Sequence, residues 1–173
     1  LIATFIVFVL LYKLADYLLK HVFEAEFYIS KSHYETIIWR ADLVDIASHL
    51  TFPTWAFIIL LNACPEKSDL GWFGDLECRL TPTTSFPTLV SAYVGFLIYD
   101  TGIKIKMSQY KSKHLLSVFH HLVAMTGWIS SSIAGFGSPG CGIALTLVDS
   151  TSVFLCAKSI IPSSTWPKTA AVN

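Results

Sequence analysis

The segment Leu115–Phe136, LLSVFHHLVAMTGWISSSIAGF, decides the fold, because it is long and apolar enough for a helix that crosses a bilayer. Ionisable side chains inside such a span are costly and normally face a bundle interior or a water-filled cavity. A single histidine there could simply hydrogen-bond a neighbouring helix. Two consecutive helical residues point about 100° apart, so one small polar contact cannot satisfy both. His120 and His121 are therefore the first candidates for a functional site.

The whole chain has the composition of an integral membrane protein. Of its 173 residues, 53% are hydrophobic and only 14% are charged, and the mean hydropathy is +0.57. The net charge of +0 provides no basic field of the kind that binds nucleic acid, so we expect no nucleic-acid partner. The chain starts within an apolar run at Leu1, and we interpret it as a fragment of a larger domain.

The pattern of apolar runs predicts an all-α, polytopic transmembrane bundle that forms a single domain over residues 1–173. Residues 23–40 are expected to form a polar and aromatic connector, and residues 64–85 an extramembrane loop. Cys64 and Cys78 in that loop are either bonded to each other or free thiols. The five predicted spans are 1–22, 42–63, 86–107, 115–136 and 141–161.

The lysines and arginines are unevenly divided between the two sides of the predicted bundle. The basic turn SQYKSKH (108–114) and the other basic segments fall on one side, whereas Lys67 and Arg79 fall on the other. Because cytoplasmic loops carry the excess of basic residues, the basic turn is predicted to be cytosolic.

Several ionisable residues are predicted to lie at a similar depth below the cytosolic surface. At about 1.5 Å per helical residue, His49 and Asp100 lie roughly 10 Å into their spans, and His120 and His121 roughly 8 to 9 Å. Asp149 lies deeper. We expect these residues to share one cavity; the alternative is a set of separate contacts between helices.

Three stretches carry a family resemblance: YVGFLIYD ending in Asp100, SVFHHLVAMTG with the histidine pair, and LTLVDSTSVF around Asp149. Over roughly Trp39–Ile161 the chain resembles the TLC-domain family of membrane proteins. The resemblance implies a helical bundle around a lipid-accessible cavity, in the endoplasmic reticulum or a related endomembrane, with the plasma membrane as the alternative.

Within that family the chain is less similar to the ceramide synthases. Asp149 and the Ala157–Lys158 pair match their pattern, but Val148 stands where they have histidine and Ser152 where they have a second aspartate. Acid–base groups of an acyl transfer are thereby missing. The resemblance therefore favours the non-synthase members, which are linked to lipid homeostasis.

Two functions follow as expectations. The first is a protein that binds, senses or handles a membrane lipid in an intramembrane polar cavity, with membrane lipids as partners and a homo-oligomer left open. The alternative is an acyltransferase of the ceramide synthase type, which uses fatty acyl-CoA as co-substrate and a sphingoid base. No other cofactor is expected.

The candidate site is the same for both functions. In catalysis, His120 or His121 would act as base or acyl acceptor, and Asp100 or Asp149 would orient the imidazole. The expected substrate-binding residues are His49, Ser150, Ser152, Lys111 and Lys113. The basic turn, together with Lys104 and Lys106, would hold CoA phosphates, although the orientation rule alone also explains these lysines.

Two further enzyme chemistries have little support. The HxxHH box of fatty acid elongases resembles SVFHH, but Ser117 occupies the place of the first histidine. His114, His120, His121 and Asp149 do not have the spacing of a known metal-ligand set, so no metal site is predicted.

Overall fold

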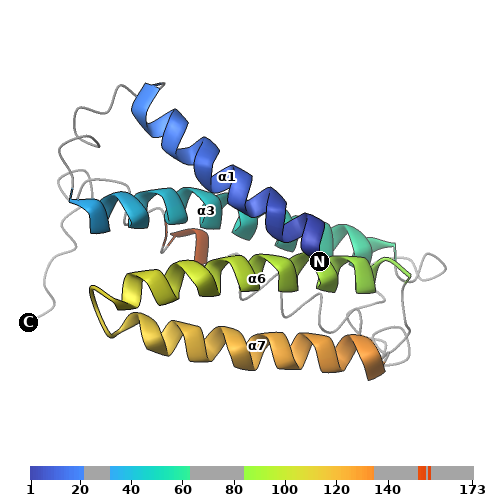
Figure 1. Ribbon diagram of the computed structural model, residues 1–173. Coiled ribbons are helices and arrows are strands. Elements are labelled where there is room, and N and C mark those ends of the chain that lie inside the picture. Colours follow the sequence, from blue (N-terminus) through green and yellow to red (C-terminus); the bar gives the residue numbers. More distant parts are fainter. Residues whose placement is uncertain (22–31, 63–83, 135–151, 155, 157–173) are drawn as a thin grey trace, which may run out of the picture.

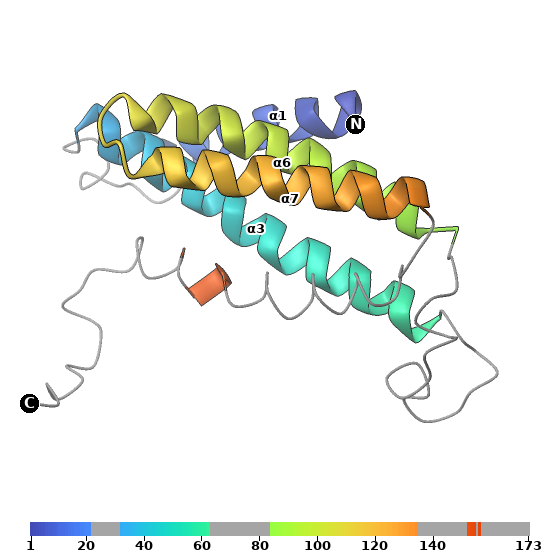
Figure 2. The same cartoon turned by 90° about the horizontal axis from the view of Figure 1, so that it is seen from below.

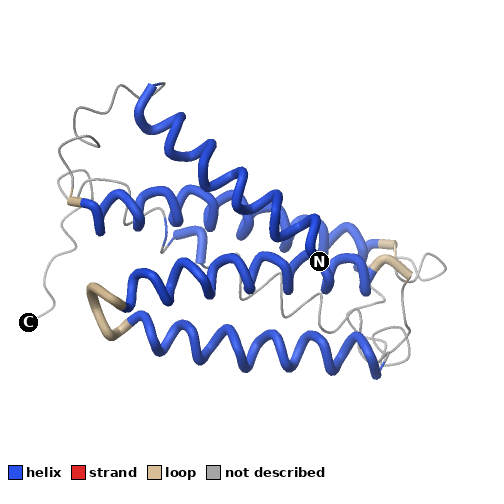
Figure 3. The backbone as a smooth tube through the Cα atoms, in the orientation of Figure 1, coloured by secondary structure: helices blue, strands red, loops and turns tan. Residues whose placement is uncertain are grey.

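The computed structural model describes residues 1–21, 32–62, 84–134, 152–154 and 156 (Figure 1). Within them the regular structure is entirely helical, which confirms the all-α prediction (Figure 3). The long helices are α1 (Ile2–His21), α3 (His33–Leu61), α6 (Phe86–Ser108) and α7 (His114–Ala134).

Three of the described helices, α1, α3 and α6, are long and apolar enough to cross a membrane. The helix α7 coincides with the predicted span 115–136 but does not belong to this group, because its histidines and hydroxyl residues lower its apolarity. The predicted span 141–161 lies outside the described residues, apart from 152–154 and 156, which are helical. Cys64 and Cys78 also lie outside them.

The helix α3 begins earlier than the sequence interpretation has it. The connector predicted over 23–40 is wrong from His33 onward, because α3 begins there rather than at Asp42. Ser32 caps the helix: its hydroxyl accepts a hydrogen bond from the Glu35 amide at 3.3 Å, and the Glu35 carboxylate accepts one from the Ser32 amide at 3.0 Å. This capping box satisfies amide groups that would otherwise lack partners at the helix start.

The helix α6 lies at the centre of the bundle and contacts α1, α3 and α7 (Figures 1 and 2). Its buried aromatic residues pack against Phe8 of α1 and Phe52 of α3; the Phe8 ring centroid lies 5.1 Å from that of Phe96. At Gly95 the helices α1 and α6 come so close that an added Cβ would lie 2.9 Å from Thr4 Cβ. Burial of these rings supplies the main apolar contact between the helices.

The helices α6 and α7 form an antiparallel hairpin joined by the basic turn (Figure 3). Both views show them side by side, and α3 diverges from them toward its C-terminal end (Figure 2). The hairpin fixes which residues of the two helices face each other, and this register positions the site.

Candidate functional site

The short hairpin turn brings Asp100 and His121 to the same level of the bundle. Asp100 lies eight residues before the end of α6 (108 − 100) and His121 seven residues after the start of α7 (121 − 114). At about 1.5 Å per residue, the two positions lie within about 2 Å of the same height. His121 Nε2 is 3.3 Å from Asp100 Oδ2, and the two side chains are only 11% and 6% exposed.

The other ring nitrogen of His121 also has a partner on α6. Thr101 Oγ1 lies 3.3 Å from His121 Nδ1, and the same hydroxyl donates a hydrogen bond to the Leu97 carbonyl at 2.6 Å. The orientation of the imidazole is therefore fixed at both nitrogens.

A part-buried lysine links this pair to α3. Lys104 Nζ lies 3.2 Å from Asp100 Oδ1 and 3.4 Å from Asp45 Oδ2. The Asp45 side chain is 4% exposed and that of Lys104 is 16% exposed. Buried charges need such pairing, because desolvating an isolated one is very unfavourable.

The sequence interpretation missed Asp45 as a site residue. For the acyltransferase alternative, it placed Lys104 beside the cytosolic mouth as a contact for CoA phosphates. The structure shows its ammonium between two carboxylates, in a pairing that the sequence interpretation did not include. A signal was present: Asp45 and His49, like Asp100 and Lys104, are four residues apart and so share a helix face.

A cavity of about 770 Å³ lies between α3, α6 and α7. It is lined by the charged residues described above and by His49, His120, Ser117 and Ser152. The expectation that His49, Asp100, His120 and His121 share one cavity is therefore met. Asp149 and Ser150 lie outside the described residues, so their predicted roles stay predictions.

The cavity lining combines charged and polar side chains with apolar ones. Lys104 and Asp100 lie toward the end of α6 that adjoins the basic turn. Tyr93, at the other end of the α6 lining, lies seven residues before Asp100, or about 10 Å along the helix. Apolar side chains line the cavity along its whole length, from Leu116 and Phe119 near the basic turn to Val123, Ala124, Leu97, Phe96 and Tyr93 farther from it.

The two histidines of the pair differ in their surroundings. The His121 side chain is largely buried and held by α6, whereas His120 is exposed on the cavity wall. Their ring centroids are 6.0 Å apart. His120 is thus the histidine that a molecule in the cavity could reach directly.

The predicted substrate-binding lysines of the turn lie outside the cavity lining. Lys111 Nζ is 5.0 Å from the centre of the Tyr34 ring, which is a cation–π distance, and Lys113 is exposed. The Tyr34 hydroxyl and His114 Nε2 form a hydrogen bond of 2.8 Å. Burial and, next, the Lys113 ammonium lower the pKa of His114 below its ordinary value of 6.5.

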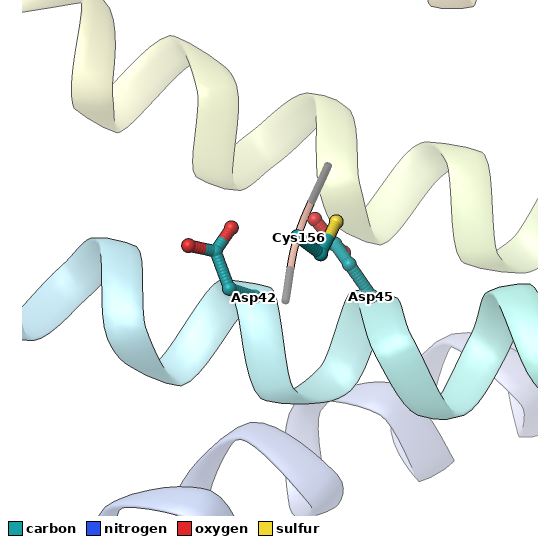
Figure 4. Close-up of side chains that lie close together, drawn as sticks. All are labelled: Asp42, Asp45 and Cys156. Atoms are coloured by element: carbon teal, nitrogen blue, oxygen red, sulfur yellow. The ribbon is translucent and has the colours of Figure 1, made fainter. Parts of the chain in front are cut away.

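A different group of potential metal ligands lies on α3 and near the C-terminus. Ligand atoms of Asp42, Asp45 and Cys156 lie within 4.8 Å of one another (Figure 4). Asp45 already has the Lys104 ammonium as its counter-ion, and a metal cation there would be repelled by it. This cluster therefore gives no argument for a metal centre.

Comparison with protein families matches residues 38–171 to the TLC domain. Neither a curated protein nor a solved structure matches the chain.

Proposed function

Because this chain belongs to the TLC-domain family, we propose that it is a multi-pass membrane protein of lipid homeostasis that binds, senses or handles a membrane lipid. The proposed ligand site is the cavity between α3, α6 and α7. The headgroup would lie beside Asp100 and His120, and the acyl chain would lie along the apolar lining.

The observation that carries this proposal is a cavity in which the charged side chains of Asp45, Asp100 and Lys104 adjoin an extended apolar lining. A lipid is an amphiphile, and such a lining offers polar contacts to its headgroup and apolar contacts to its acyl chain. The volume of about 770 Å³ is within the range of sites that enclose a small-molecule ligand. The polar groups of such a site determine orientation and specificity, while the apolar lining supplies most of the contact area.

His120 is the residue that tests the proposal most directly, because it is exposed on the cavity wall. The full chain would be purified in lipid nanodiscs of mixed composition, and retained lipids would be identified by mass spectrometry after exchange into detergent. We expect one lipid class to be retained in near-stoichiometric amount, and we expect His120→Gln to reduce its retention at least tenfold.

A matched control is His21→Gln, since His21 is an exposed residue at the end of α1 and contacts Tyr17 rather than the cavity. It should retain the lipid as the unsubstituted protein does. Retention of many lipid classes in bulk proportions, unchanged by His120→Gln, would contradict the proposal.

Acyl transfer is the second candidate, supported by an imidazole beside a carboxylate inside the cavity. In that reaction the amine of a sphingoid base would attack the thioester carbonyl of a fatty acyl-CoA, the C–S bond would break, and an imidazole would accept the amine proton. Lys111 and Lys113 would contact the CoA phosphates. Incubation with labelled acyl-CoA and a sphingoid base tests this: labelled amide that is lost on His121→Gln supports transfer, and the absence of labelled amide in the unsubstituted protein supports binding alone.

We further propose the endoplasmic reticulum or a related endomembrane as the location, with the plasma membrane as the alternative. Fluorescent tagging of the full-length protein beside organelle markers distinguishes them.

A further inference from the structure

Four side chains from three helices form a chain of alternating charge beside the cavity. Lys104 Nζ lies between Asp45 Oδ2, at 3.4 Å, and Asp100 Oδ1, at 3.2 Å. The second oxygen of Asp100, Oδ2, lies 3.3 Å from His121 Nε2. Asp100 thus faces a different partner with each oxygen, and the alternation is complete only if His121 is positively charged.

The contacts of the Thr101 hydroxyl indicate that His121 Nδ1 is protonated. A threonine hydroxyl has one proton to donate, and that proton goes to the Leu97 carbonyl, the nearer acceptor at 2.6 Å. The contact of 3.3 Å between Thr101 Oγ1 and His121 Nδ1 then requires Nδ1 to be the donor. Nδ1 therefore carries a hydrogen.

The carboxylate of Asp100 indicates that the other ring nitrogen of His121, Nε2, is protonated as well. An ionised carboxylate only accepts hydrogen bonds, and a nitrogen lone pair directed at it would be repelled. At 3.3 Å from Asp100 Oδ2, Nε2 is favoured as an N–H group. With both nitrogens protonated, the ring is an imidazolium.

From these contacts we propose that His121 is a positioning residue, an imidazolium that ends the chain Asp45–Lys104–Asp100–His121 and joins α7 to α6. It does not serve as the general base of the cavity. The inference deepens the proposed function, because it leaves His120 as the histidine that contacts the ligand.

Some groups around His121 favour the neutral ring and others favour the charged ring. Burial, Lys104 on α6, His120 on α7 and His49 on α3 favour the neutral ring. Asp100 favours the charged ring, and its Oδ2 lies 3.3 Å from Nε2. Lys104 binds the opposite oxygen of Asp100, so its ammonium does not displace the imidazole from Oδ2.

Nitrogen NMR tests the protonation state of His121 in the full chain. The protein, labelled with ¹⁵N at its histidines, would be reconstituted in lipid nanodiscs at pH 7.5 without added ligand, and the His121 signals would be assigned by their loss in His121→Gln. In an imidazolium both ring nitrogens give N–H type signals, whereas a neutral ring gives one N–H type and one lone-pair type signal. We expect two N–H type signals.

Two variants test the role of the neighbours and keep the test independent of the folding of His121→Gln. Asp100→Asn should convert one set of signals from imidazolium to neutral imidazole, which assigns that set to His121, while Lys104→Arg should leave it unchanged. A neutral His121 in the unsubstituted protein overturns the inference, as does an imidazolium that persists in Asp100→Asn. Failure of the lipid to co-purify would contradict the proposed function without affecting this result.

Discussion

The hydroxyl of Tyr34 and Nε2 of His114 lie 2.8 Å apart, which ties the first turn of α3 to the first residue of α7. The ring of Tyr34 also packs on Tyr110 of the basic turn, with centroids 5.3 Å apart, and lies below the Lys111 ammonium. These contacts hold the α6–α7 hairpin against the part of α3 that precedes Asp45. The position of Asp45 relative to Lys104 depends on that docking.

Removal of the Tyr34 hydroxyl should loosen this end of the bundle. We expect Tyr34→Phe to destabilise the protein by about 1 kcal/mol, the usual net contribution of one hydrogen bond. Thermal unfolding in nanodiscs measures the change. Tyr17→Phe is the control, because Tyr17 is 57% exposed on α1, and it should leave the unfolding temperature unchanged. Equal unfolding temperatures for the two variants would show that the Tyr34–His114 bond contributes nothing to stability.

The same contact predicts a loss of stability in acid. The pKa of His114 is lowered in the folded protein, mainly by burial, so the unfolded chain binds more protons between the folded value and 6.5. The contribution of His114 to the free energy of unfolding is therefore fully present above pH 6.5, and it decreases as the pH falls through the lowered pKa. Unfolding temperatures of the unsubstituted protein and of His114→Gln, measured from pH 8 to pH 5, should converge toward acid. A difference that grows toward acid has the wrong sign for this account.

Helix positions were predicted well wherever apolar length decides them. The segments 1–22, 86–107 and 115–136 agree with α1, α6 and α7 to within two residues at each end, because each is a long apolar run bounded by polar residues. The start of α3 was missed, because its first turns are aromatic and charged. The capping box of Ser32 and Glu35 is a local signal that could have located it.

The site was predicted in part, for a related reason. Depth along a helix follows from residue number, so His49, Asp100, His120 and His121 could be brought to one level. Partner choice depends on how each helix is rotated about its axis, and that depends on the packing of many side chains. Asp45 and Lys104 lie near the ends of apolar runs, where charged residues usually face headgroups. Only the packing of α3 against α6 shows that they pair.

Gly95 predicts a steric limit on the contact between α1 and α6. A Cβ at this position would lie 2.9 Å from Thr4 Cβ and 3.1 Å from the Leu1 carbonyl oxygen, so the helices would have to separate. Overpacking of this kind destabilises by about 1–3 kcal/mol, and we expect Gly95→Ala to do so. Gly102→Ala, where a Cβ meets nothing within 4 Å, should be neutral or stabilise by up to about 1 kcal/mol. Thermal unfolding compares the two, and equal effects would contradict close packing at Gly95.

Charge balance predicts an order of stability among variants of the four linked side chains Asp45, Lys104, Asp100 and His121. Lys104→Met removes the ammonium and leaves Asp45 and Asp100 as buried like charges, which should destabilise the protein by about 3–5 kcal/mol. Adding Asp45→Asn removes one of these charges and leaves Asp100 paired with His121. The double variant should therefore unfold at a higher temperature than Lys104→Met alone, although it carries more substitutions. If the double variant is the less stable of the two, the loss arises from packing of the lysine stem rather than from the uncompensated carboxylates.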